Sequence, residues 1–255
     1  MYSVLHKLLS DKKDGVLFSC FDIWHLAYIF LALAVAILFL YRFKNKPVQT
    51  KEKISRILIT SAFGLYIADF FLMPLAYNEI DIEKLPFHAC TAMCVMCFLS
   101  YHIKFLAKYR SSFVLLGFIS NLVYLIYPAG LMWHQVAPFS YRVIQTLLFH
   151  GLMAVYGLFV LVYEYEDFRF KHCYRELFVL AGMTLWAILG NSLYNGTSEH
   201  YSHFFNWFFV VRDPFYLFPE AISPYIMPVV NIALFFAAEM LIYSVLYFCK
   251  RKPSV

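Results

Sequence analysis

Two residues far apart in the sequence, Cys90 and His150, have the side chains best suited to covalent chemistry. A cysteine thiolate attacks ester carbonyls, and a histidine takes up the thiol proton as a general base. Pro86 is typical of the first position of a helix, which places Cys90 in the second turn, near the positive end of the helix dipole that favours thiolate. The pattern predicts Cys90 as nucleophile and His150 as base. The alternative for Cys90 is a small apolar residue of the interior.

Other polar side chains fall inside apolar stretches at a similar depth. Ionisable groups in a membrane usually face the interior of a helix bundle, which makes them functional candidates. With a helical rise of about 1.5 Å per residue, Cys90, His150 and Asp69 lie roughly 6, 10 and 12 Å from the outer ends of their expected spans. Asn191 comes at the outer end of a later span, and His88 lies on a different helix face from Cys90. We expect a site in the outer half of the membrane.

The composition places these residues in a membrane protein. Of 255 residues, 62% are hydrophobic and 15% are charged, whereas soluble domains have about 25% charged residues. The apolar residues come in long blocks, and the net charge is +5. These features exclude a soluble enzyme, a disordered regulator, a disulfide scaffold and a nucleic-acid-binding protein. We therefore expect an all-α, polytopic membrane helix bundle.

Apolar segments of about 20 residues, enough to cross the hydrocarbon core as helices, divide the chain into seven expected spans. They lie near 23–41, 56–77, 85–105, 111–130, 143–163, 177–194 and 224–248. After the first span, loops rich in Lys and Arg alternate with loops that have few, and the 42–56 loop holds six of these residues. The positive-inside rule then predicts an external N-terminus and a cytoplasmic C-terminus. We expect one transmembrane domain over residues 1–255 of a multi-pass protein.

The segment 195–223 is unusually aromatic for an aqueous loop. Nine aromatic residues follow Gly196, among them Trp207. Such a segment is typical of the membrane interface, and it suits a short helix or a lid over the mouth of the bundle. The alternative is an interfacial anchor without a gating role.

Three sequence motifs resemble those of a known membrane family. The run Leu85–Cys90, with the sequence LPFHAC, resembles the LPLHLC signature of the YwaF-like integral membrane family. The run Asn206–Pro214 resembles that family's NYMFL–KP block, with Trp207 in place of a tyrosine. Phe149–Gly151 resembles its SHG-type element, and Asn191 takes the place of a family asparagine.

The YwaF-like family is related to the eukaryotic transmembrane-protein-164 family, which is proposed to be a cysteine-dependent phospholipid acyltransferase. The resemblance therefore implies a catalytic pair formed by Cys90 and His150. It also implies membrane lipids, phospholipid or lysophospholipid, as the substrates, and the plasma membrane of a bacterium as the location.

The favoured hypothesis is an integral membrane lipid acyltransferase or lipid hydrolase in which a cysteine thiolate attacks a lipid ester. Asn191, Asn206 or backbone N–H groups would stabilise the oxyanion. His88, Asp69 and Trp207 are expected to support the site or to bind the substrate.

Two other hypotheses remain open. An outward-facing transporter or small-molecule-binding protein would use Asp69, His88 and His150 to line a polar cavity, although the sequence lacks the paired repeats common in transporters. A metal or redox protein would use histidines together with the three cysteines of the third span. No diagnostic metal or cofactor motif accompanies them, so we expect neither a metal nor a cofactor. The sequence predicts no oligomeric state.

Overall fold

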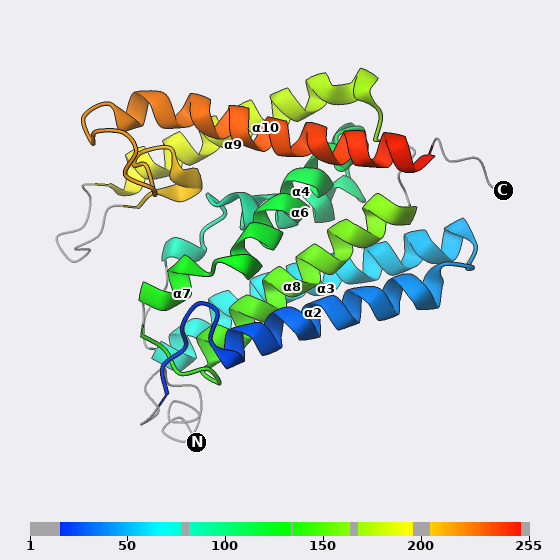
Figure 1. The fold of residues 1–255 in the computed structure, drawn as a ribbon, viewed down its shortest axis with the longest axis horizontal. Coiled ribbons are helices and arrows are strands. Elements are labelled where there is room, and N and C mark those ends of the chain that lie inside the picture. The colour runs from blue at the N-terminus through cyan, green and yellow to red at the C-terminus, as the bar shows by residue number, and fades with distance from the viewer. Residues whose placement is uncertain (1–15, 78–81, 134, 164–167, 196–204, 251–255) are drawn as a thin grey trace. The chain divides into compact units, whose positions relative to one another are not determined.

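The computed structural model describes residues 16–77, 82–133, 135–163, 168–195 and 205–250. These residues form helices and connecting turns and contain no strand, as expected for an all-α membrane protein (Figure 1). The α-helices are α2 (Ile23–Phe43), α3 (Val48–Tyr77), α4 (Ala89–Ser100), α5 (Lys104–Ala107), α6 (Arg110–Ile126), α7 (Ala129–Trp133), α8 (Tyr141–Tyr163), α9 (Cys173–Tyr194) and α10 (Ser223–Lys250). Short 3-10 turns between them are η1 (Ile82–Lys84), η3 (Phe170–His172) and η4 (Trp207–Phe209).

Within the described residues, five helices are long and apolar enough to cross a membrane: α2, α3, α8, α9 and α10. Helices α4 and α6, where the third and fourth spans are expected, are apolar but shorter, at 12 and 17 residues. The structure supports an integral, multi-pass membrane protein. The count of seven spans and the orientation of the two termini stay predictions.

The expected third span, 85–105, is interrupted in the structure. Helix α4 begins at Ala89, and Pro86 lies in the turn before it instead of at the first helical position. The helix ends at Ser100, where the Tyr101 N–H bonds back to carbonyls of the last turn, and α5 begins only at Lys104. An average of hydropathy over 20 residues conceals this break, because the apolar residues on both sides dominate the average.

Helix α3 begins at Val48, earlier than the expected start at Arg56. Several basic residues assigned to the 42–56 loop therefore lie in its first turns. Arg56 pairs with Glu52 one turn before it at 2.9 Å, and the Lys51 ammonium donates to the Lys44 carbonyl at 2.9 Å. Such local pairs stabilise the part of a helix that lies outside the hydrocarbon core. Hydropathy does not predict that part of the helix, because its residues are polar.

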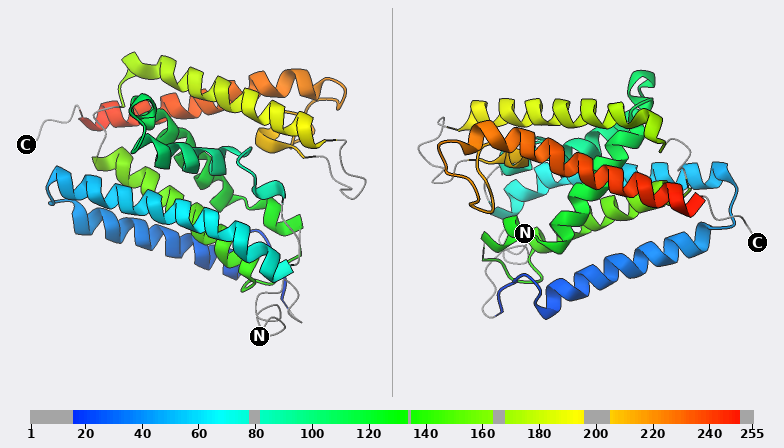
Figure 2. Two further views of the ribbon diagram at one scale, coloured as in Figure 1. Left: turned by 180° about the vertical axis from the view of Figure 1, so that it is seen from behind. Right: turned by 45° about the horizontal axis from the view of Figure 1, so that its top comes forward.

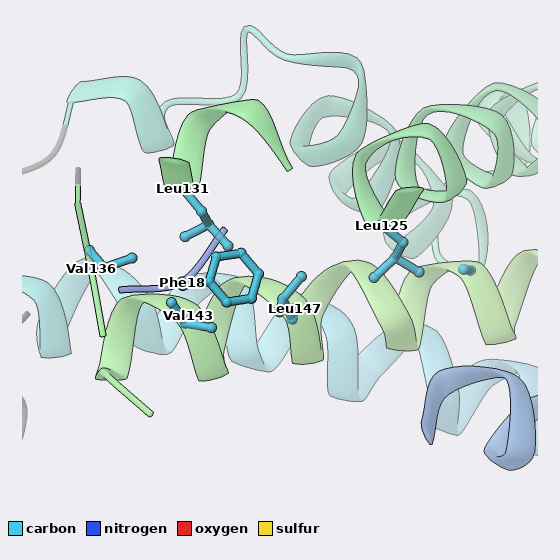
Figure 3. Packing of buried hydrophobic residues seen from close by; sticks show 7 residues of the cluster. Phe18, Leu125, Leu131, Val136, Val143 and Leu147 are labelled. Atoms are coloured by element: carbon cyan, nitrogen blue, oxygen red, sulfur yellow. The ribbon is translucent and has the colours of Figure 1, made fainter. Parts of the chain in front are cut away.

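The chain divides into two compact units: unit 1, residues 1–84 with 120–164, and unit 2, residues 85–119 with 165–255. In unit 1, α8 packs against both α2 and α3 (Figure 1) and is the most buried of the five long helices. The Phe18 N–H donates to the Val136 carbonyl at 2.8 Å, which ties the chain before α2 to the loop before α8. Figure 3 shows the apolar cluster around this contact: Phe18, Leu125, Leu131, Val136, Val143 and Leu147.

In unit 2, α9 and α10 lie side by side, as the two views of Figure 2 show. The Tyr243 hydroxyl on α10 donates to the Glu176 carboxylate on α9 at 2.7 Å, and both side chains are buried. Glu239 lies one turn before Tyr243 and is buried as well. Because a buried polar group needs a partner, the Tyr243–Glu176 bond favours one relative register of the two helices.

Candidate functional site

Cys90 is the second residue of α4 and is half-buried. The structure therefore places it in the first turn, one turn earlier than predicted and closer to the positive end of the helix dipole. His88 is the N-cap residue, and its carbonyl accepts from the Ala92 N–H at 2.9 Å and from the Thr91 hydroxyl at 3.2 Å.

The turn before α4 is fixed by contacts with α9. The indole N–H of Trp186 donates to the Pro86 carbonyl at 2.6 Å, and the Phe87 ring stacks on Trp186 with centroids 4.9 Å apart. Phe87 also packs directly on Gly190, where an added Cβ would lie 2.4 Å from its ring. These contacts set the point at which α4 begins, and with it the position of Cys90. Sequence reasoning missed them, although a glycine inside a helical pattern is a signal of close packing.

The other cysteines of α4, Cys94 and Cys97, are fully buried in the interior. In the part of the chain that the structure describes, no group of three or more His, Cys, Asp or Glu side chains is arranged to hold a metal ion. The metal hypothesis therefore finds no such ligand set among those residues.

His150 lies in the middle of α8 and is buried, with 7% of its surface exposed. Its Nδ1 atom is 2.7 Å from the Asn121 side-chain oxygen, and its ring stacks on Tyr124 with centroids 3.8 Å apart and planes 13° apart. Asn121 and Tyr124 are three residues apart on α6, so one face of that helix holds the imidazole in a single orientation. The sequence shows Asn121 as an amide inside an expected span, but it does not show which side chain it meets.

Cys90 belongs to unit 2 and His150 to unit 1.

Asp69, near the end of α3, is almost completely buried, with 1% of its surface exposed. The Tyr141 hydroxyl donates to one carboxylate oxygen at 2.7 Å, and the Lys84 ammonium lies 3.1 Å from the other. Lys84 is also 3.4 Å from the Gln145 oxygen and 3.5 Å from the Thr146 hydroxyl. Asp69 is thus held inside a polar cluster that joins α3, η1 and α8, and the sequence alone identifies none of its partners.

Asn191 and Trp207 meet in unit 2. The Asn191 amide donates to the Trp207 carbonyl at 3.1 Å and to the Ala187 carbonyl at 2.8 Å, and its oxygen accepts from the Trp207 N–H at 3.1 Å. Trp207 is 1% exposed and stacks on Phe205 with centroids 4.4 Å apart. Asn191 therefore anchors the backbone of the aromatic segment, and the Trp207 ring belongs to the packed interior of unit 2.

The aromatic segment after α9 is shaped by polar side chains. Residues 196–204 lie outside the described residues. Further along, the Asn206 oxygen accepts from the Val211 and Arg212 N–H groups, each at 3.0 Å. The Asp213 carboxylate accepts from the N–H groups of residues 215, 217 and 218 at 2.8, 2.5 and 2.9 Å. Desolvation alone would raise the pKa of the Asp213 carboxyl, but these three donors together lower that pKa below its usual value.

The comparisons with known proteins place the chain in a family. A search of curated proteins and a search of solved structures each gave no match. The family model described as the TMEM164 family matches residues 18–248, which include α4, α8 and the aromatic segment. This match agrees with the motifs found in the sequence, and the chain belongs to the TMEM164 family.

Proposed function

We propose that this membrane protein is a lipid acyltransferase or lipid hydrolase in which Cys90 is the nucleophile and His150 the general base. The observation that carries the proposal is the setting of His150: a buried imidazole held in one orientation by a 2.7 Å contact with Asn121 and a stacked ring. A base must be held in this way if it is to take a proton along one direction. The position of Cys90 in the first turn of α4 supports its proposed role as the nucleophile.

The proposed reaction proceeds in two steps. His150 takes the thiol proton as the Cys90 sulfur attacks the carbonyl carbon of a lipid ester, and the tetrahedral intermediate then expels the lipid alkoxide. The alkoxide takes the proton from the imidazolium and leaves as an alcohol, which gives a lysolipid and an acyl thioester on Cys90. In the second step His150 accepts a proton from water or from a lysophospholipid hydroxyl as that oxygen attacks the thioester carbonyl. The C–S bond then breaks, a fatty acid or a diacyl lipid leaves, and His150 returns the proton to the Cys90 thiolate.

The test is mass spectrometry of the purified protein in phospholipid vesicles. We expect an acyl adduct on the peptide that contains Cys90, and a loss of lipid turnover by about 100-fold or more in C90A and in H150Q. Cys249 is an exposed cysteine at the end of α10, so C249A serves as the matched control and should retain full turnover. Addition of lysophospholipid separates the two reactions, because only an acyltransferase then forms a new diacyl lipid.

Lipid turnover that survives in C90A would overturn the proposal. Flux of a solute into proteoliposomes that also survives in C90A would instead favour the transporter hypothesis.

A further inference from the structure

The second half of α6 supports two buried histidines of unit 1. Asn121 is fully buried and lies 2.7 Å from Nδ1 of His150, while the Leu125 carbonyl lies 2.8 Å from Nε2 of His25. The two imidazoles thus contact α6 through different ring nitrogens. A neutral imidazole carries one N–H, so the partner of each nitrogen decides where that proton resides.

For His25 the backbone alone determines the tautomer. The Phe21 N–H donates to Nδ1 at 2.9 Å, so Nδ1 holds a lone pair. The Leu125 carbonyl can only accept, so Nε2 must carry the proton. Neither partner can exchange its role, which makes His25 an internal reference with the proton on Nε2.

For His150 the contact at Nδ1 points to the opposite tautomer. The atom of Asn121 that faces Nδ1 is the side-chain oxygen, which can only accept, so this contact favours the proton on Nδ1 of His150. The lone pair is then on Nε2, which becomes the nitrogen able to take up a proton. An amide achieves this without bringing a further charge into an apolar interior.

We propose that Asn121 is a positioning residue that fixes the Nδ1–H tautomer of His150, so that Nε2 is the proton-accepting atom of the site. The catalytic meaning of this inference rests on the proposed function, while the tautomer itself does not. The stacked Tyr124 ring restrains the plane of the imidazole, and Asn121 determines which nitrogen donates.

The test is nitrogen NMR of protein labelled with ¹⁵N at histidine, with H25Q and H150Q used to assign the two buried rings. We expect His150 to show the Nδ1–H tautomer and His25 the Nε2–H tautomer in the same sample. N121L removes the acceptor, and we expect the Nδ1–H preference of His150 to be lost while the His25 signals stay unchanged. N121D keeps an acceptor oxygen, and His150 should remain protonated on Nδ1.

The inference is wrong if His150 of the wild-type protein carries its proton on Nε2, or if N121L leaves its tautomer unchanged. If the tautomer shifts in N121L as expected, lipid turnover should fall through kcat, with KM little changed. Failure of the proposed function has a different signature, because turnover would then survive in C90A whatever tautomer His150 adopts.

Discussion

At the end of α3, a carboxylate with almost no exposed surface is held by a tyrosine hydroxyl and a lysine ammonium. The lysine, Lys84, comes from η1 and contacts Asp69 on α3 and two polar side chains on α8. A buried charge is tolerated only when its partners replace the water that it has lost. Asp69 and Lys84 therefore depend on each other, and each alone would destabilise the interior of unit 1.

This dependence predicts that K84M destabilises the protein by about 3 kcal/mol, because the variant leaves Asp69 buried without its ion-pair partner. Thermal unfolding in detergent micelles measures the effect. The double variant D69L/K84M removes both charges and should recover most of the lost stability. Lys53 is an exposed lysine on α3, so K53M is the matched control and should shift stability by less than about 0.5 kcal/mol. Equal effects of K84M and K53M would contradict the prediction.

For single residues, the sequence reveals which ionisable side chains lie in apolar segments, but it does not reveal what those side chains contact. Asp69 and His150 stand out as ionisable groups in apolar segments, and both are buried. Their partners Lys84 and Asn121 lie on other elements, and Lys84 looks like an ordinary loop charge. Helical periodicity relates residues along one helix only, so contacts between helices remain hidden until the helices are packed.

Helix α9 is the element that sets the start of α4. Its Gly190 lies against the Phe87 ring, and its Trp186 donates to the Pro86 carbonyl. The contact with Phe87 involves ring atoms near the backbone, which cannot move aside without shifting the turn. The geometry around Cys90 therefore depends on a glycine that has no chemistry of its own.

We predict that G190A destabilises the protein by about 2 kcal/mol, since the new methyl group overlaps the Phe87 ring and forces the turn before α4 to move. The same change should slow alkylation or acylation of Cys90. Gly182, on the same helix, has no atom within 4 Å of an added Cβ. G182A should therefore leave Cys90 reactivity unchanged and stabilise the helix by up to about 1 kcal/mol. A G190A protein as stable as G182A would show that the contact does not constrain the turn.

The end of a helix was predictable from the sequence only where it coincides with the end of an apolar stretch. The expected spans 143–163 and 177–194 end at the observed C-terminal residues of α8 and α9, Tyr163 and Tyr194. The start of α3 and the break after Ser100 depend instead on ion pairs and on local hydrogen bonds. Such interactions involve a few atoms each, and an average over an apolar window does not register them.

For the whole molecule, the number of membrane spans depends on whether α4 and α6 cross the membrane. If both cross, the segment between them, which contains Lys104, lies in the cytoplasm, as the positive-inside rule predicts. If neither crosses, the same segment lies outside. Both arrangements leave the two termini on opposite sides, so the location of the termini cannot distinguish them.

We predict that K104C is protected from a membrane-impermeant maleimide in intact cells and is labelled after permeabilisation, with peptide mapping to identify the labelled residue. Lys104 is exposed, so access to the thiol is not limited by packing. Glu220 is exposed in the segment before α10, which is expected outside, and E220C should be labelled in intact cells. Cys249 is exposed at the other end of α10 and should behave like K104C. Labelling of K104C in intact cells would indicate five spans.

The backbone of the aromatic segment is held by polar side chains rather than by its aromatic ones. The Asn231 amide donates to the carbonyls of Phe208 and Phe209 at 2.7 and 3.0 Å, and both phenylalanines have a left-handed backbone, with φ of 54° and 52°. By contrast, residues 215–217 are 73%, 87% and 74% exposed. The residues that fix the backbone path of the segment are therefore different from the residues that form its exposed surface. Substitutions at 215–217 can therefore change the exposed surface of the segment over evolutionary time, without the chain having to find a new fold.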